Sequence, residues 1–279
     1  MRNLLIHLEA TSTLDSLLAC AHLVARRFGS YVEGFYVGLG PSDIIAAGAD
    51  GFVAAAPELV ASIEREARER AERIRERFVR FWESLGVPLD GQGEGVRVRW
   101  REDPGAGAGL LGSVGRCYDL ILVGRPGGGA GMAALESALF EAGRPILVVP
   151  PTPPESLGRH VVVAWNGSTE SARTVALAMP FLAQAEQVTV LTVREGMVPG
   201  PDGAALAAAL ARHGLSVARH EVSRGEASVG ETILAQCRAV GGDLLIKGAY
   251  TQSRLRQMIF GGATSHILHH TEVPVVMAN

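Results

Sequence analysis

The chain has 279 residues, of which 47% are hydrophobic and 20% are charged, and its formal net charge is −3. This apolar share is large enough to build a hydrophobic core, so a wholly disordered chain is excluded. The slightly acidic balance excludes a protein built to coat nucleic acid or an anionic membrane. The length fits one large domain or two domains of about 140 residues each.

The cysteines and the lysine narrow the possible classes of protein further. Cys20, Cys117 and Cys237 are far apart and form no CxxC pair, so we expect neither a disulfide framework nor a thiolate zinc site, and a cytoplasmic protein fits best. Lys247 is the only lysine, and Gly248 follows it. A P-loop needs lysine before serine or threonine, so a Walker-type ATPase is excluded. A Schiff-base enzyme would have to use Lys247.

We expect neither a signal peptide nor a membrane span. Glu9 interrupts the short apolar run at the start of the chain, and no cleavage-site pattern follows it. No window approaches the roughly 20 consecutive apolar residues that a transmembrane helix needs.

The first half alternates predicted strands and helices. Strands are expected over 3–8, 31–37, 96–101, 118–124 and 144–149, and helices over about 13–28, 57–85 and 106–116. A Gly- and Ala-rich insert, 38–57, precedes the second helix. That helix carries opposite charges at i,i+4 spacing, as in the run 64–73, which predicts a solvated helix face. The alternative is a partner-binding surface.

A proline-rich linker divides the chain nearly in half. Four prolines within residues 150–154 cannot lie in a helix interior or a central strand, so we expect a stiff, extended linker over 151–158 between domains at 1–150 and 159–279. The second half repeats the order of the first. Its strands are expected over 160–165, 187–193, 216–222, 242–248 and 273–277, and its helices over about 169–184, 202–213 and 227–240, with a last helix opened by 261–264.

Alternating strands and helices with continuous apolar strands predict α/β architecture with a parallel sheet covered on both faces. Each half should therefore be a five-stranded doubly wound domain. Ligands of such folds bind beyond the carboxyl ends of the strands, where the strand order switches.

The chain resembles the universal stress protein family, in its tandem two-domain form. The residues that carry this are the strand-turn 163–168, the strand 243–248, the helix opening 261–264 and the segment 267–275. The resemblance covers essentially the whole chain, most strongly 159–279. It implies two Rossmann-like, adenine nucleotide alpha hydrolase-like domains and a binding and signalling role under stress. It also implies slow ATP hydrolysis at most, no catalytic residue, and no metal beyond nucleotide-bound magnesium.

The resemblance also implies how the halves associate. The family often dimerises through antiparallel pairing of its last strands, so residues 146–149 are expected to pair with 275–278 inside one chain as an internal pseudo-dimer. Further homodimerisation and an unidentified protein partner stay open. Neither a nucleic acid nor a membrane is an expected partner.

Nucleotide-binding members of the family carry Gly-x-x-Gly, nine residues, and Gly-Ser/Thr. Here the spacing is intact, but Thr251 replaces the second glycine and Gly262 replaces the hydroxyl residue. The resemblance implies an ATP or other adenine nucleotide site in the second half. Its expected cofactor-binding residues are Ala164, Asn166, Val193, Lys247, Gly248, Thr251, Gly261, Gly262, Ala263 and Thr264. The alternative is a loop that merely turns from strand to helix.

The position of Asn166 holds aspartate in ATP-binding relatives, where it contacts the adenine side of the nucleotide. Asparagine keeps an acceptor and adds a donor, and it could equally cap the helix that starts near Ser168. In the first half Glu9 takes this place. The loop after Gly124 is about five residues shorter than its counterpart, and no Gly-Ser/Thr opens the last helix. We therefore predict that the first site is degenerate.

Other readings remain for two features. His266 and His270, at i,i+4, could chelate zinc, or could suit a helix C-terminus. Trp165 could stack on a base, although an aromatic residue at a strand end is more often core. The alternative function is a nucleotide-free interaction or scaffold protein that uses the helix 57–85 and the insert 38–57. An adenylate-forming enzyme is disfavoured because neither SGGxDS nor a HIGH/KMSKS pair occurs.

Overall fold

The computed structural model describes residues 1–38, 57–103, 109–127, 129–249 and 262–279, so most of the insert at 38–57 lies outside the described residues. The elements of the first half are β1 (Asn3–His7), α1 (Leu14–Phe28), β2 (Tyr31–Val37), α3 (Pro57–Ser84), β3 (Arg97–Asp103), α4 (Gly109–Gly115), β4 (Leu120–Gly124), α5 (Gly129–Glu141) and β5 (Ile146–Val149). Those of the second half are β6 (His160–Ala164), α6 (Thr169–Leu182), β7 (Gln187–Val193), the 3₁₀ turn η2 (Arg194–Gly196), α7 (Gly203–Ala211), β8 (Val217–Val222), α8 (Val229–Ala239), β9 (Leu244–Gly248), α10 (Ala263–His270) and β10 (Val275–Ala278).

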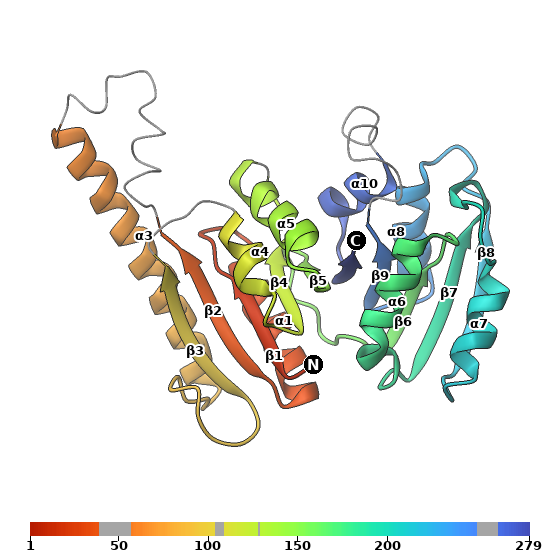
Figure 1. Cartoon of the computed structure of the whole chain (residues 1–279), viewed down its shortest axis with the longest axis horizontal. Helices are drawn as coiled ribbons and strands as arrows, with labels where there is room; N and C mark the ends of the chain where they lie inside the picture. The colour runs from red at the N-terminus through yellow and green to blue at the C-terminus, as the bar shows by residue number, and fades with distance from the viewer. Residues whose placement is uncertain (39–56, 104–108, 128, 250–261) are drawn as a thin grey trace.

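The described strands form a single ten-stranded sheet, in the order β3-β2-β1-β4-β5-β10-β9-β6-β7-β8. Neighbouring strands within each half are parallel. At the centre β5 pairs with β10 antiparallel, with Val148 opposite Val275 and Ile146 opposite Met277. The two halves lie side by side and meet at these strands (Figure 1). The predicted fold class and the predicted pairing of the closing strands are both confirmed.

Helices cover both faces of the sheet because apolar side chains of successive strand residues point to opposite sides. Leu4 and Ile6 of β1 belong to a buried cluster that includes residues of α1, α3, α6 and α7. Leu5 belongs to a second cluster, which includes residues of α4, α5, α8 and α10. Cys237 is fully buried in the second cluster, where it packs as a small hydrophobic residue.

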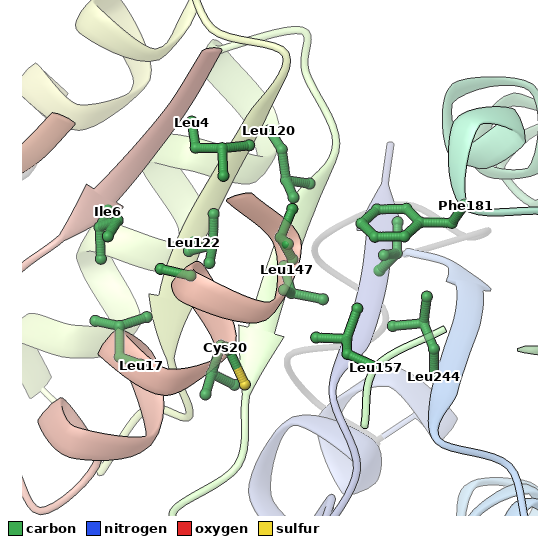
Figure 2. Packing of buried hydrophobic residues seen from close by; sticks show 14 of the residues in the cluster. Leu4, Ile6, Leu17, Cys20, Leu120, Leu122, Leu147, Leu157, Phe181 and Leu244 are labelled. Carbon is green, nitrogen blue, oxygen red and sulfur yellow. The ribbon is translucent and has the colours of Figure 1, made fainter. Parts of the chain in front are cut away.

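The first cluster continues from one half into the other. Figure 2 shows Leu147 of β5 near Leu157, Leu244 and Phe181. The Phe181 ring meets Phe28 of α1 edge to face, with ring centroids 5.2 Å apart. Aromatic pairs of this geometry stabilise a core beyond their area burial. The C-terminal ends of α1 and α6 therefore pack the two halves together.

Hydrogen bonds fasten the linker to the second half. The Asp243 carboxylate accepts from Ser156 Oγ at 2.7 Å and from the N–H groups of Gly158, Arg159 and His160, each at 3.0 Å. Hydrogen bonds to a charged acceptor are stronger than neutral ones. Asp243 therefore fixes the point at which the chain enters β6.

Helix α3 has one buried and one solvated side. Ala71, Ile74, Phe78 and Trp82 recur at helical spacing and are buried. On the exposed side, ion pairs at i,i+4 spacing join Glu64 to Arg68, Glu69 to Arg73 and Glu76 to Arg80. This confirms the predicted solvated face.

We expect Phe181→Ala to lower the free energy of unfolding by about 3–5 kcal/mol, because it leaves a cavity in the cluster that both halves share. Urea denaturation measures this change. The control is Leu85→Ala, since Leu85 is 41% exposed; its effect should stay below about 1 kcal/mol. A Phe181 variant as stable as that control would show that the two halves do not depend on this contact.

Candidate functional site

The candidate site lies where the strand order of the second half switches. β7 and β8 lie to one side of β6, and β10 lies to the other side of β9. Helix α6 follows β6 onto the face of the first cluster, whereas α10 follows β9 onto the face of the second. The carboxyl ends of β6 and β9 thus lie between the N-termini of α6 and α10, and we call this place the opening. Ligands of such folds bind at this position.

Lys247 extends from β9 to the start of α10. Its ammonium Nζ donates to Gly248 O at 2.6 Å and to Thr264 Oγ1 at 2.9 Å. Thr264, the second residue of α10, is 4% exposed. Within the part of the chain that the structure describes, no carboxylate forms an ion pair with Lys247. The chain's only lysine therefore brings an uncompensated positive charge to a helix start.

Helix α10 begins without a side-chain cap. Its N-cap is Gly262, as the sequence predicted, and glycine has no group to accept from the first N–H groups. The other main helices of the second half are capped. Ser168 accepts from Ser171 N, Asp202 accepts from Ala205 N, and Ser228 accepts from Glu231 N. Helix α10 thus begins beside Lys247 with N–H donors that its N-cap residue cannot satisfy through a side chain.

These two features oppose each other electrostatically. A helix N-terminus carries a partial positive charge and favours anions, yet Lys247 brings a cation to it. Burial lowers the pKa of the Lys247 ammonium to about 8, because the charged form loses water without gaining a counter-charge. An anion bound between Lys247 and α10 would relieve both costs at once.

Asn166 stands at the other side of the opening, after the end of β6. Its Oδ1 accepts from Ser168 N at 3.2 Å and from Ser171 Oγ. Because a backbone N–H can only donate, the atom facing Ser168 must be the oxygen. The amide Nδ2 makes no hydrogen bond to any described residue. Asn166 therefore supports the turn into α6 through its Oδ1, and this cap-like role leaves its amide donors unused by the described residues.

The remaining predicted residues divide into three groups. Ala164 and Val193 are 5% and 4% exposed and belong to the second cluster, so they form the apolar floor beneath the opening. A Cβ at Gly248 would lie 2.5 Å from Ser171 N, so only glycine lets β9 end this close to α6. Thr251 and Gly261 lie outside the described residues.

The equivalent place in the first half carries the opposite charge. Glu9 follows β1 as Asn166 follows β6, and its Oε2 lies 3.3 Å from where a Cβ of Gly131 would be, in the first turn of α5. Val123 takes the place of Lys247 on β4. His7 is buried with its Nδ1 3.7 Å from Glu9 Oε1, and burial lowers the pKa of His7 to about 4. The first half thus has its own carboxylate beside the start of α5.

Two residues of the site escaped the sequence analysis. Ser171, whose hydroxyl donates to Asn166, lies three residues after the N-cap Ser168, a spacing that could have indicated it. Arg125, in the shortened loop of the first half, donates from Nη1 to Thr271 O at 3.1 Å. Thr271 is the C-cap of α10, so a cation from the first half sits at the end of α10 that favours one.

Two alternatives are decided by the geometry. Trp165 is 5% exposed and donates to Pro201 O at 2.8 Å, so it belongs to the core. His266 and His270 stack with ring centroids 4.3 Å apart, and His270 Nδ1 donates to His266 O, which favours the helix-terminus role. Across the described residues, no group of three or more His, Cys, Asp or Glu is placed to hold a metal ion. No helix there has the length and apolarity to cross a membrane.

A groove of about 800 Å³ lies between β7, β8 and the start of α7. Arg194 and Glu221, which line it, form an ion pair at 2.7 Å. Arg219 and Asp202 line it as well, so its charge is mixed and favours no ligand class.

The comparisons with known proteins agree with this fold. Residues 158–279 match the model of the universal stress protein family. A universal stress protein from Archaeoglobus fulgidus DSM 4304 has a TM-score of 0.66 at 14% identity, covering 99% of this chain and 96% of that one. A functionally unknown protein from Pseudomonas aeruginosa PAO1 has a TM-score of 0.53 at 14% identity, covering 100% and 92%. No curated protein sequence matches the chain.

Residues 158–279 thus match the universal stress protein family by sequence, and the whole chain shares its fold with a universal stress protein of similar length.

We expect Lys247→Met to raise the free energy of unfolding at pH 7, by up to about 3 kcal/mol, because it removes a desolvated and unpaired charge. The folded pKa of about 8 lies below the ordinary 10.5, so the unfolded chain binds more protons between these values. Wild-type stability should therefore rise from pH 8 to pH 10.5, and that of the methionine variant should not.

Urea denaturation at several pH values checks both expectations. The matched control is Arg212→Met, which removes an exposed cation and should change stability by less than about 0.5 kcal/mol. A methionine variant less stable than the wild type would mean that Lys247 serves the fold rather than a ligand.

Proposed function

We propose that the protein is a cytoplasmic stress-response binding protein whose second half holds the phosphates of a nucleoside triphosphate such as ATP. One observation carries the proposal: the Lys247 ammonium lies on the uncapped start of α10 with no carboxylate beside it among the described residues. The match of residues 158–279 to the universal stress protein family supports the stress-response role. The free cysteines Cys20, Cys117 and Cys237 support a reducing compartment.

The residues at the opening suit the parts of a nucleotide. Lys247 Nζ, the Thr264 hydroxyl and the first N–H groups of α10 would hold phosphate oxygens, since such donors together favour multiply charged anions. The Asn166 amide, on the neighbouring strand end, would face the nucleoside. Ala164 and Val193 supply an apolar floor beneath it.

The first half is proposed to bind no nucleotide. The Glu9 carboxylate lies beside the first turn of α5, and a phosphate brought there would be repelled by it. The proposed role in the second half is binding rather than turnover. Among the described residues, no carboxylate or imidazole is hydrogen-bonded to Lys247 or Thr264, so none is placed there to activate water.

We expect ATP binding, measured by calorimetry, to depend on the protonation of Lys247. Burial lowers the pKa of Lys247 to about 8, which brings its titration into an accessible pH range. The affinity should fall about tenfold per pH unit above pH 8, because binding must then take up a proton. Lys247→Met should weaken binding tenfold or more at pH 7.

Lys247→Arg is the matched control, because a guanidinium stays protonated; its ATP affinity should hardly change between pH 8 and pH 10. The complementary measurement is mass spectrometry of small molecules released from freshly purified protein by denaturation. An empty extract together with no calorimetric signal at millimolar MgATP would contradict the proposal, and the chain would then be a nucleotide-free interaction protein.

A further inference from the structure

Lys247 is chemically singular within the chain. The sequence holds no other lysine, so Nζ of Lys247 is its only side-chain primary amine. Most lysines are kept as ammonium ions by water or a carboxylate. Lys247 is half-buried, and none of the described carboxylates pairs with it.

The contacts of Nζ are compatible with a neutral amine. Gly248 O accepts an N–H whether the nitrogen carries three hydrogens or two. The Thr264 hydroxyl oxygen accepts from an ammonium, and it can equally accept from the second N–H of a neutral amine. Loss of a proton from Nζ therefore breaks neither contact, and it leaves a nucleophilic lone pair beside the start of α10.

The start of α10 is suited to an attached carboxylate. Its N-cap is Gly262, which has no side chain that could accept from the first N–H groups. The first half shows how a carboxylate can occupy such a place: Glu9 Oε2 lies 3.3 Å from the Cβ position of Gly131, in the first turn of the equivalent helix α5. The second half has Asn166 instead of a glutamate, and the helix start there faces an amine.

We propose that Lys247 is a carbamylation site that takes up dissolved CO₂. The Nζ lone pair forms an N–C bond to the carbon of CO₂, and the electron pair of one C–O π bond moves to oxygen. The nitrogen releases one proton to solvent, and nothing is oxidised or reduced. The product is a lysine carbamate, an anion in place of a cation at the start of α10.

The product satisfies the groups around it. Gly248 O accepts the remaining carbamate N–H, and the Thr264 hydroxyl and the first N–H groups of α10 donate to the carbamate oxygens. One further consequence rests on the proposed function: the carbamate occupies the place of the phosphate, so CO₂ and ATP compete for this site. The carbamylation itself does not depend on nucleotide binding.

The test uses the full-length protein with ¹³C-labelled bicarbonate. A carbon NMR spectrum should show a carbamate resonance that Lys247→Arg abolishes, while any carbamate on the Met1 amine persists in that variant and serves as an internal control. Trapping with triethyloxonium ion followed by peptide mass spectrometry should place the modification on Lys247. Thr264→Val, which keeps the branched shape but removes the hydroxyl, should lower the modified fraction several-fold.

Modification of the Met1 amine alone would overturn the proposal. If the wild-type protein carries no carbamate on Lys247 but still binds ATP through Lys247, the carbamylation is contradicted and the proposed function is supported. A carbamate on Lys247 in a protein that binds no ATP would support the carbamylation and contradict the proposed function. A carbamate signal that saturating ATP leaves unchanged would contradict the competition.

Discussion

The antiparallel pairing of β5 with β10 is the interaction on which the arrangement of the molecule depends. Both strands are almost fully buried, over Ile146 to Val149 and Val275 to Ala278. As edge strands they would expose apolar side chains and unpaired backbone N–H and C=O groups. Pairing them joins the two parallel sheets into one. The remaining edges are β3 and β8, whose strands carry charged side chains that discourage further pairing.

The same pairing brings the first half against the candidate site. Next to the paired strands, Arg125 of the first half reaches the C-cap of α10, the helix whose start carries the proposed phosphate site. Phe28 and Phe181 close the opposite face. The first half therefore contributes to the site through the placement of α10, although its own strand ends carry a charge that disfavours an anion.

The two halves show how one fold carries opposite chemistry. At the strand ends, Glu9 corresponds to Asn166, and Val123 corresponds to Lys247. These two differences change the charge beside the last helix from negative to positive. Because the backbone arrangement is shared, the charge at the helix start, rather than the fold, decides whether an external anion is favoured.

Much of this architecture is predictable from sequence. Runs of β-branched residues mark the strands, the prolines at 150–154 mark the linker, and the repeat order gives the doubly wound topology. The period of two residues along β9 also places Lys247 on the face opposite to Leu244 and Ile246.

The details of the site could not be predicted, because they depend on contacts between segments far apart in the chain. The hydrogen bond from Lys247 to Thr264 needs the position of α10, which no local pattern specifies. The approach of Glu9 to the first turn of α5 joins residues more than a hundred positions apart. The fixed orientation of the Asn166 amide follows from Ser171, one turn into α6.

The proposed phosphate site depends most on the charge state of the Lys247 amine. Because the chain holds only one lysine, this charge state can be measured directly. Protein made with lysine labelled at the ε-carbon gives one NMR signal, which can be titrated with and without inorganic tripolyphosphate. The account predicts a pKa near 8 in the free protein and a clear rise toward the ordinary value of about 10.4 when the anion is present. An ordinary pKa in the free protein, unchanged by tripolyphosphate, would contradict it.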